Sequence, residues 1–328
     1  MEQKIIKLLL IIIFFFILLF GKIIIKKPTK VKMDVMEILN KLNNKEGNVL
    51  KYNNFLKKSN SKNECYLPLE SNEIKIIHLI ITRFCIDFYH RNGFPKRMYD
   101  EKYIKNAIRV MKKYLITSLE NQSCKDFIFV LMLGNKANIT NIKYLFNLTN
   151  LFKFKIIYEK DIKKYIKIVS KNFEVLITTR IDYDDQIYYD AVNDARKAIN
   201  INKPMILYGY KRGVFFFESN NKYYDYYYGN AEGVPSIFIS LIVTLNKVND
   251  TYYIYDLGDH SFIRKNFLKT YKLYGIKKLD YEPAVFDSGD PKFIYVRQEY
   301  SGAYNYYKLI PKKLKAHNFN LSLFYGGI

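Results

Sequence analysis

Short apolar runs alternate with segments of helical periodicity between residues 74 and 199. The apolar runs are rich in β-branched and aromatic residues and have the length of buried strands. They lie at residues 74–81, 127–133, 154–158 and 175–178. Between them, apolar residues recur with helical spacing, most clearly over 103–119. This alternation predicts an α/β fold with a mostly parallel sheet flanked by helices.

The carboxyl-terminal half has a different pattern. Three further apolar runs follow residue 204 and predict consecutive strands of a meander, at 205–210, 214–217 and 223–228. Residues 235–243 (PSIFISLIV) fit either a helix entered at Pro235 or a buried strand. The helix that includes residues 191–199 is expected to begin soon after Asp185.

The sharpest local feature is the segment TTRIDYDD at residues 178–185, which directly follows the apolar run VLI. Hard divalent cations such as Mg²⁺ and Mn²⁺ prefer carboxylate oxygens and also bind substrate phosphates. A loop at a strand end can project Asp182 and Asp184 to the same side, with Asp185 as a third ligand or an orienting group. Arg180 can offset their charge and grip a phosphate through two hydrogen bonds. The alternative is an acidic surface turn in which Asp184 or Asp185 caps the next helix.

Three segments together resemble a known enzyme family. TTRIDYDD resembles the acidic motif of GT-A fold glycosyltransferases, and most closely that of the rhamnosyltransferase group, roughly TTR-[LI]-D-x-DD. Residues 118–123 (SLENQS) resemble the S-x-x-N-Q segment of inverting, family-two-like glycosyltransferases. Residues 80–84 (IITRF) resemble the first strand of the rhamnosyltransferase group, where the nucleotide begins to be held. The resemblance covers residues 74–200, and the chain beyond residue 204 matches only loosely.

The resemblance implies a GT-A-like, Rossmann-type domain that binds a nucleotide-sugar donor and a divalent metal, Mn²⁺ or Mg²⁺. The implied metal ligands are Asp182, Asp184 and Asp185. The implied donor-binding residues are Thr82, Arg83, Gln122, Arg180 and Asp182. Two of these have structural alternatives, because Arg83 also fits a surface salt bridge and Gln122, with Asn121, also fits a helix cap.

The sequence departs from the family in two ways. The second strand ends Leu133-Gly134-Asn135, where related enzymes often carry an Asp pair that contacts the nucleotide. No motif identifies the catalytic base, and Asp287 is our choice among the loop acids, which also include Asp290 and Glu232. His260 fits either the metal shell or an ordinary core or surface position.

The amino terminus carries the run LLLIIIFFFILLF at residues 8–20. With its flanks it supplies the ~20 apolar residues of a spanning helix. The alternative is a cleaved signal peptide whose apolar region is residues 8–20, but no small-x-small cleavage site follows the run. We therefore expect a single-pass anchor at 1–27, a stem at 28–72 and a catalytic domain at 73–328. Lysines after the run favour a cytoplasmic domain, whereas glycosylation sequons such as Asn138-Ile139-Thr140 matter only in a secretory lumen. The side of the membrane stays open.

Charge and cysteine content exclude some classes of protein. The net charge is +22, but the basic residues are scattered, and heavy use of Lys, Asn, Ile and Tyr is typical of AT-rich coding sequence. We therefore expect no nucleic-acid partner. The three cysteines, Cys65, Cys85 and Cys124, predict neither a disulfide framework nor a zinc site, and they leave the redox compartment open.

These observations predict an enzyme that transfers a sugar, with metal assistance, from a nucleotide-sugar donor to a hydroxyl of a glycan or glycolipid. The alternative is a non-catalytic, membrane-tethered carbohydrate-binding protein of the same fold. The two differ in metal dependence and in turnover of the donor.

Overall fold

The computed structural model describes ten segments of the chain: residues 65–66, 74–85, 100–135, 137, 152–219, 221–227, 238–258, 263–274, 284–286 and 291–297. All of them fall within one compact unit, Ser61–Ile328. The anchor predicted at 1–27 lies outside these segments, as does the predicted stem except for Cys65 and Tyr66. None of the helices in the described segments is long and apolar enough to cross a bilayer.

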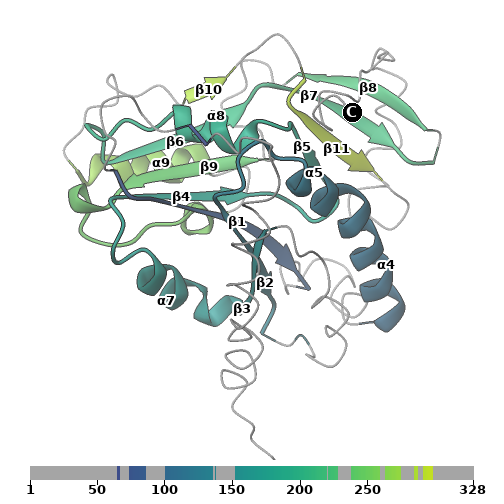
Figure 1. The fold of residues 1–328 in the computed structure, drawn as a ribbon, viewed down its shortest axis with the longest axis horizontal. Coiled ribbons are helices and arrows are strands. Elements are labelled where there is room, and N and C mark those ends of the chain that lie inside the picture. The colour runs from purple at the N-terminus through teal and green to yellow at the C-terminus, as the bar shows by residue number, and fades with distance from the viewer. Residues whose placement is uncertain are drawn as a thin grey trace, which may run out of the picture. The chain divides into compact units, whose positions relative to one another are not determined.

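A seven-stranded sheet in the order β10-β6-β9-β4-β1-β2-β3 forms the centre of the unit (Figure 1). Its strands are β1 (Ile76–Phe84), β2 (Ile128–Leu133), β3 (Lys153–Tyr158), β4 (Val175–Arg180), β6 (Met205–Tyr210), β9 (Ile239–Thr244) and β10 (Ala284–Phe286). β9 runs antiparallel to both of its neighbours, and every other pairing is parallel. The prediction of a mostly parallel sheet is confirmed, and the ambiguous segment 235–243 contributes the strand β9.

One face of this sheet carries the main apolar cluster. Alternate residues of β1, Ile77, Leu79 and Ile81, belong to it, as the two-residue period of a strand requires. The cluster continues into α7 (Glu159–Val169), the 3₁₀ helix η6 (Ile254–Leu257) and α9 (Ile263–Lys272). Burying one such aliphatic side chain stabilises the fold by roughly 1.5–3 kcal/mol, so this cluster fixes η6 against the sheet.

A continuous helical segment follows β1 in the chain. It comprises α4 (Glu101–Met111), the π-helix η3 (Lys112–Ile116) and α5 (Thr117–Glu120), which confirms the helix predicted over 103–119. Asp100 caps its start, because the carboxylate accepts a 2.7 Å hydrogen bond from the Lys102 backbone N–H. π-Helical turns are rare in proteins and occur mostly as single widened turns within α-helices.

A second, four-stranded sheet has the order β5-β11-β7-β8 (Figure 1). Its strands are β5 (Gln186–Ile187), β7 (Arg212–Phe217), β8 (Lys222–Tyr227) and β11 (Phe293–Arg297). Val110 and Tyr114 of the helical segment pack against its apolar residues Val214, Phe216 and Val296. The predicted meander is therefore wrong: β6 joins the central sheet, and only β7 and β8 pair with each other, because the chain changes sheets at Lys211.

The helix expected directly after Asp185 begins later than predicted. β5 comes first and pairs antiparallel with β11, and α8 (Ala191–Lys197) starts only after it. The partner strand lies about a hundred residues further along the chain, so no local pattern indicated that residues 186–187 were extended.

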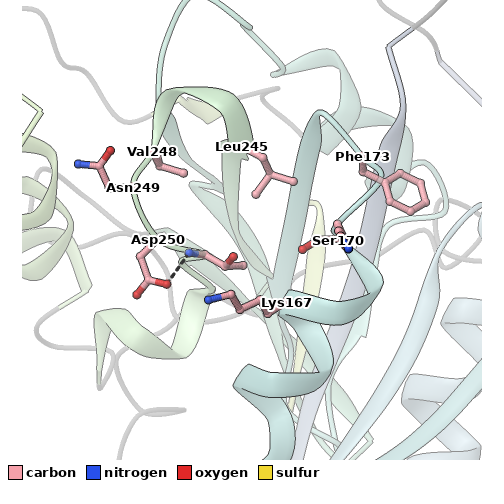
Figure 2. A pocket seen from close by; sticks show the side chains of 9 residues that line it. Lys167, Ser170, Phe173, Leu245, Val248, Asn249 and Asp250 are labelled. Carbon is pink, nitrogen blue, oxygen red and sulfur yellow. Dashed lines mark hydrogen bonds between the residues drawn. The ribbon is translucent and has the colours of Figure 1, made fainter.

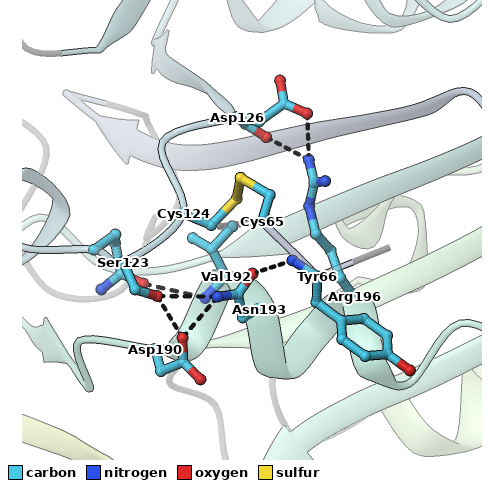
Figure 3. Close-up of a disulfide and its surroundings, with 10 residues drawn as sticks. Cys65, Tyr66, Ser123, Cys124, Asp126, Asp190, Val192, Asn193 and Arg196 are labelled. Carbon is cyan, nitrogen blue, oxygen red and sulfur yellow. Dashed lines mark hydrogen bonds and ion pairs between the residues drawn. A yellow bond between two sulfur atoms is a disulfide. The ribbon is translucent and has the colours of Figure 1, made fainter. Parts of the chain in front are cut away.

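A disulfide joins Cys65 to Cys124 across 59 residues (Figure 3). The cysteine spacing predicted no disulfide framework, and it did not indicate this single bond, because spacing says nothing about which segments meet in the fold. The neighbouring Tyr66 backbone N–H donates to the Asn193 Oδ1 at 2.8 Å. Cys85 is a free thiol, and burial raises its pKa to about 12.

Candidate active site at the carboxyl ends of β1 and β4

The ends of β1 and β4 lie side by side at one edge of the central sheet. These strands are parallel neighbours with Ile81 opposite Arg180, and the Ile181 N–H donates to the Ile81 carbonyl at 3.4 Å. Thr82 and Arg83 on one strand therefore lie beside the acidic turn at 181–185 on the other. Ligands of open α/β sheets bind at this carboxyl edge.

Two arginines from these strand ends converge on one aromatic ring. The guanidinium carbon of Arg83 lies 5.1 Å from the centre of the Tyr255 ring, and that of Arg180 lies 5.2 Å from it. Both distances fall within the range of cation–π attraction. Arg180 is fully buried and Arg83 is half-buried. The site thus concentrates positive charge at the end of two strands.

Tyr255 is the residue of this site that sequence reasoning missed. It belongs to η6, and its hydroxyl donates to the Ile81 carbonyl at 3.1 Å across 174 residues of sequence. Burial raises the pKa of Tyr255 to about 12, although the charges of Arg180 and Arg83 act in the opposite direction. The phenol therefore stays protonated near neutral pH and keeps its role as donor. No spacing or motif in the sequence connects it with residues 82 to 185.

The carboxylates of Asp182 and Asp184 in the acidic turn act on different neighbouring side chains. Burial raises the pKa of Tyr183 well above its usual value, and the charges of Asp184 and, more weakly, Asp182 raise it further. Asp182 also acts on Tyr255, whereas Asp184 acts on Tyr103, whose hydroxyl lies 3.2 Å from that of Tyr183. The charge of Asp182 thus acts on the ring that both arginines contact, whereas that of Asp184 acts on the tyrosine pair.

Asp185 is fully buried and faces the small sheet. Its Oδ1 accepts a 3.2 Å hydrogen bond from the Val296 backbone N–H on β11. This bond ties the end of the acidic turn to β11, next to the pairing of β5 with the same strand. A part for Asp185 in metal binding stays a prediction.

The donor set of the turn suits a hard cation only in part. No three His, Cys, Asp or Glu side chains within the described segments are grouped so as to hold a metal ion. Asp182 and Asp184 supply two carboxylates from one short turn, of which Asp184 is 8% exposed. Mg²⁺ commonly binds proteins through one or two carboxylates and takes its other ligands from water and substrate phosphates. The two carboxylates fit that mode of binding.

Thr82 is placed differently from Arg83. Adjacent residues of a strand point to opposite faces of a sheet, so the Thr82 side chain lies on the face opposite Arg83. The Thr82 hydroxyl is fully buried and has no hydrogen-bond partner among the residues that the structure describes. Buried polar groups nearly always have a partner, which makes this hydroxyl a candidate contact for a bound molecule.

Gln122 uses its whole amide within the protein. Its Nε2 donates to the Ser118 carbonyl at 3.1 Å and to the Tyr188 carbonyl at 2.8 Å. Its Oε1 accepts from the Val192 N–H at 3.1 Å, in the first turn of α8. These contacts give Gln122 the structural capping role that was the alternative to donor binding.

The remaining candidates lie beyond the described segments or at their ends. Asp287 and His260 are outside the described residues. β10 ends at Phe286 and is parallel to β6, so it finishes at the same sheet edge as β1 and β4. Three strand spacings separate it from β4, or roughly 14 Å. At the end of β2, the Asn135 Oδ1 accepts from the Lys160 N–H at 3.2 Å.

A pocket of about 250 Å³ lies at the opposite edge of the sheet (Figure 2). It lies between the carboxyl end of α7, with Lys167 and Ser170, and the loop after β9, with Leu245 and Asp250. Phe173, which also lines it, precedes β4, so the pocket is at the amino end of that strand. It is therefore separate from the arginines and carboxylates described above.

Comparisons with known proteins give limited information. No protein-family model and no curated protein matches the chain. HddC from Yersinia pseudotuberculosis is 15% identical with a TM-score of 0.30, over 60% of this chain and 99% of HddC. The inositol-1-phosphate CTP transferase from T. maritima is 14% identical with a TM-score of 0.34, over 73% and 96% of the two chains. S. aureus TarS is 15% identical with a TM-score of 0.34, over 72% of this chain and 38% of TarS. Similarity this low assigns no activity.

Proposed function

We propose that this chain is a transferase that binds the diphosphate of a nucleotide-sugar donor between the ends of β1 and β4. The sugar then passes to a hydroxyl of a glycan or glycolipid. The observation that carries the proposal is the convergence of Arg83 and Arg180 on the Tyr255 ring, beside the carboxylates of the acidic turn. Transfer to a glycan and the likeness to rhamnosyltransferases come from the sequence motifs.

The electrostatics favour a polyanionic ligand at this edge. Two guanidiniums on adjacent strands repel each other, and that repulsion is stronger where water is scarce, as it is around the fully buried Arg180. Asp182, two residues after Arg180, adds negative charge at the same edge. A diphosphate would bring negative charge to both guanidiniums, and the planar fork of an arginine matches phosphate oxygens through paired hydrogen bonds.

The acidic turn gives the site a way to hold a divalent metal. Asp182 and Asp184 would be its protein ligands, and the donor phosphates would complete the shell. A bound Mg²⁺ or Mn²⁺ stabilises negative charge on a departing diphosphate. The arginines would share that task. Asp287 remains our candidate for the base that takes the proton of the acceptor hydroxyl.

Donor turnover by the full chain tests this proposal. The protein, purified in detergent because of the apolar run at 8–20, is incubated with a panel of nucleotide sugars and Mn²⁺ or Mg²⁺, then with chelator. Asp184→Ala removes a proposed metal ligand, whereas Asp250→Ala removes an exposed carboxylate at the opposite sheet edge. We expect metal-dependent hydrolysis that Asp184→Ala lowers by at least about a hundredfold and that Asp250→Ala leaves unchanged.

Two results would count against it. Equal turnover by Asp184→Ala and the unmodified chain would remove the acidic turn from the mechanism. Carbohydrate binding without binding or turnover of any nucleotide sugar would instead support the non-catalytic carbohydrate-binding protein.

A further inference from the structure

We propose that Tyr255 is a positioning residue that holds Arg83 and Arg180 in the geometry that grips a diphosphate. The inference rests on the proposed function and adds to it the side chain that organises the binding site. Tyr255 lies in a part of the chain where the resemblance to glycosyltransferases is loose. η6, which carries Tyr255, contacts β1, β4 and the main apolar cluster.

Hydrogen bonds fix η6 to both strands that carry the arginines. The Tyr255 hydroxyl donates to the Ile81 carbonyl on β1 at 3.1 Å. The neighbouring Ile254 N–H donates to the Thr178 Oγ1 on β4 at 2.9 Å. Ile254 is itself fully buried in the main apolar cluster. The Tyr255 ring is therefore held at both its hydroxyl end and its backbone.

This fixed ring contacts both guanidiniums. Each guanidinium carbon lies within about 5 Å of the ring centre, at 5.1 and 5.2 Å. Attraction to one ring brings Arg83 and Arg180 to the same place despite their like charges. An arginine already ordered before the ligand arrives loses less side-chain freedom on binding, which strengthens affinity without a new ligand contact. Tyr255 therefore acts on the diphosphate through the arginines.

Binding of pyrophosphate with Mg²⁺ to the full chain, measured by calorimetry, tests the role of the ring. Tyr255→Leu removes the ring, and Tyr255→Phe keeps the ring while it removes the hydroxyl, with its bonds to the Ile81 carbonyl and to Arg83. Tyr252→Leu is the matched control, since Tyr252 packs on the same apolar cluster and contacts the Tyr274 ring. We expect about tenfold weaker binding for Tyr255→Leu, a smaller loss for Tyr255→Phe, and binding within about threefold of the unmodified chain for Tyr252→Leu.

The pattern across variants separates positioning from plain packing. If donor turnover is present, Tyr255→Leu should raise KM for the nucleotide sugar much more than it lowers kcat, because the contact holds the diphosphate throughout the reaction. Equal binding by Tyr255→Leu and the unmodified chain would overturn the proposal. So would an equal loss in Tyr252→Leu, or no pyrophosphate binding by the unmodified chain. Pyrophosphate binding with the expected pattern but no turnover of any nucleotide sugar would keep this inference and refute the proposed function.

A second inference stands on the disulfide and is independent of the site. We infer that residues 61–328 mature in an oxidising compartment. The Cys65–Cys124 bond attaches the segment before β1 to the loop between α5 and β2 (Figure 3). Hydrogen bonds next to the disulfide join α8 to the same loop: the Asn193 Nδ2 donates to the Ser123 Oγ at 3.1 Å and to the Asp190 Oδ1 at 2.8 Å. Disulfides of this structural kind persist in secreted and lumenal proteins and are rare in the cytosol.

The inference opposes the side of the membrane that the lysines after residue 20 favour. The third cysteine is compatible with an oxidising compartment, because burial raises the pKa of the Cys85 thiol to about 12 and so keeps it out of disulfide exchange. Cells that express the chain are lysed in denaturant with an alkylating reagent, so that every free thiol is blocked, including the buried Cys85. The chain is then reduced and labelled with a maleimide mass tag. We expect two tagged cysteines, and none in the Cys65→Ser/Cys124→Ser variant. No tagged cysteine in the unmodified chain would mean that the thiols were reduced in the cell, and would overturn the inference.

Discussion

Loss of the Cys65–Cys124 bond should lower stability by an amount that the structure allows us to work out. The bond closes a loop with a sequence separation of 59. In the chain-entropy treatment, a loop of that length lowers the entropy of the unfolded chain by an amount worth about 4 kcal/mol at 25 °C. Structure that persists in the reduced, unfolded chain makes this an upper value.

Thermal unfolding of the full chain, with and without a phosphine reductant, checks this magnitude. For a domain of this size, 1 kcal/mol corresponds to roughly 2–4 °C in Tm, so reduction should lower Tm by about 8–15 °C. The Cys65→Ser/Cys124→Ser variant should unfold at the Tm of the reduced chain whether or not reductant is present, which controls for effects of the reductant elsewhere. A reductant shift of less than about 2 °C in the unmodified chain would refute the reasoning, as would an equal shift in the double variant.

Three further perturbations separate structural from functional residues. Gln122→Ala should lower the free energy of unfolding by ~1–3 kcal/mol in denaturant titration, because buried backbone groups lose their partners. The KM for the donor should stay unchanged, and a raised KM would show that Gln122 binds the donor after all. Gly213→Ala should destabilise by about 1–3 kcal/mol, since a Cβ there would collide with the buried Phe293 ring, and an unchanged Tm would refute the close approach. Burial raises the pKa of Glu218, but the Lys113 ammonium 2.7 Å away and a hydrogen bond from the Tyr114 hydroxyl together hold it below its usual value. Ionised Glu218 therefore stabilises the fold fully at pH values above its pKa in the unfolded chain, and this stabilisation is lost as pH falls through its lower pKa in the folded chain. Glu218→Gln should lower the free energy of unfolding by up to about 1 kcal/mol at neutral pH and by nothing in strong acid. A loss independent of pH would refute the ionic contribution.

The strands of the central sheet were the most predictable part of the fold. Runs such as 127–133 and 175–178 are buried on both faces, which leaves an uninterrupted apolar signal in the sequence. The placement of the acidic turn after β4 followed from the same signal. Because β1 and β4 are parallel and adjacent, Thr82, Arg83 and Arg180 share one sheet edge, as the alternation of strands and helices suggested.

The features that sequence reasoning missed all depend on contacts between distant segments. The two residues of β5 are extended only because β11 pairs with them, and β6 and β7 differ only in which sheet they join. Cys65 and Cys124 have no diagnostic spacing. Tyr255 reaches Ile81 from 174 residues away, and its neighbours resemble an ordinary tyrosine-rich core. Local periodicity carries no information about such pairs.

Donor kinetics of two arginine variants test whether the β1–β4 edge binds the diphosphate of the donor. Arg83→Ala removes one guanidinium from the Tyr255 ring, whereas Arg109→Ala removes an exposed arginine of α4 that hydrogen-bonds only to Asn106 among the contacts described. A charged hydrogen bond is worth about 1.5–3 kcal/mol, so the account predicts that Arg83→Ala raises the nucleotide-sugar KM about tenfold to a hundredfold. Arg109→Ala should leave KM unchanged. Equal KM values for Arg83→Ala and the unmodified chain would contradict the assignment of the β1–β4 edge as the diphosphate site.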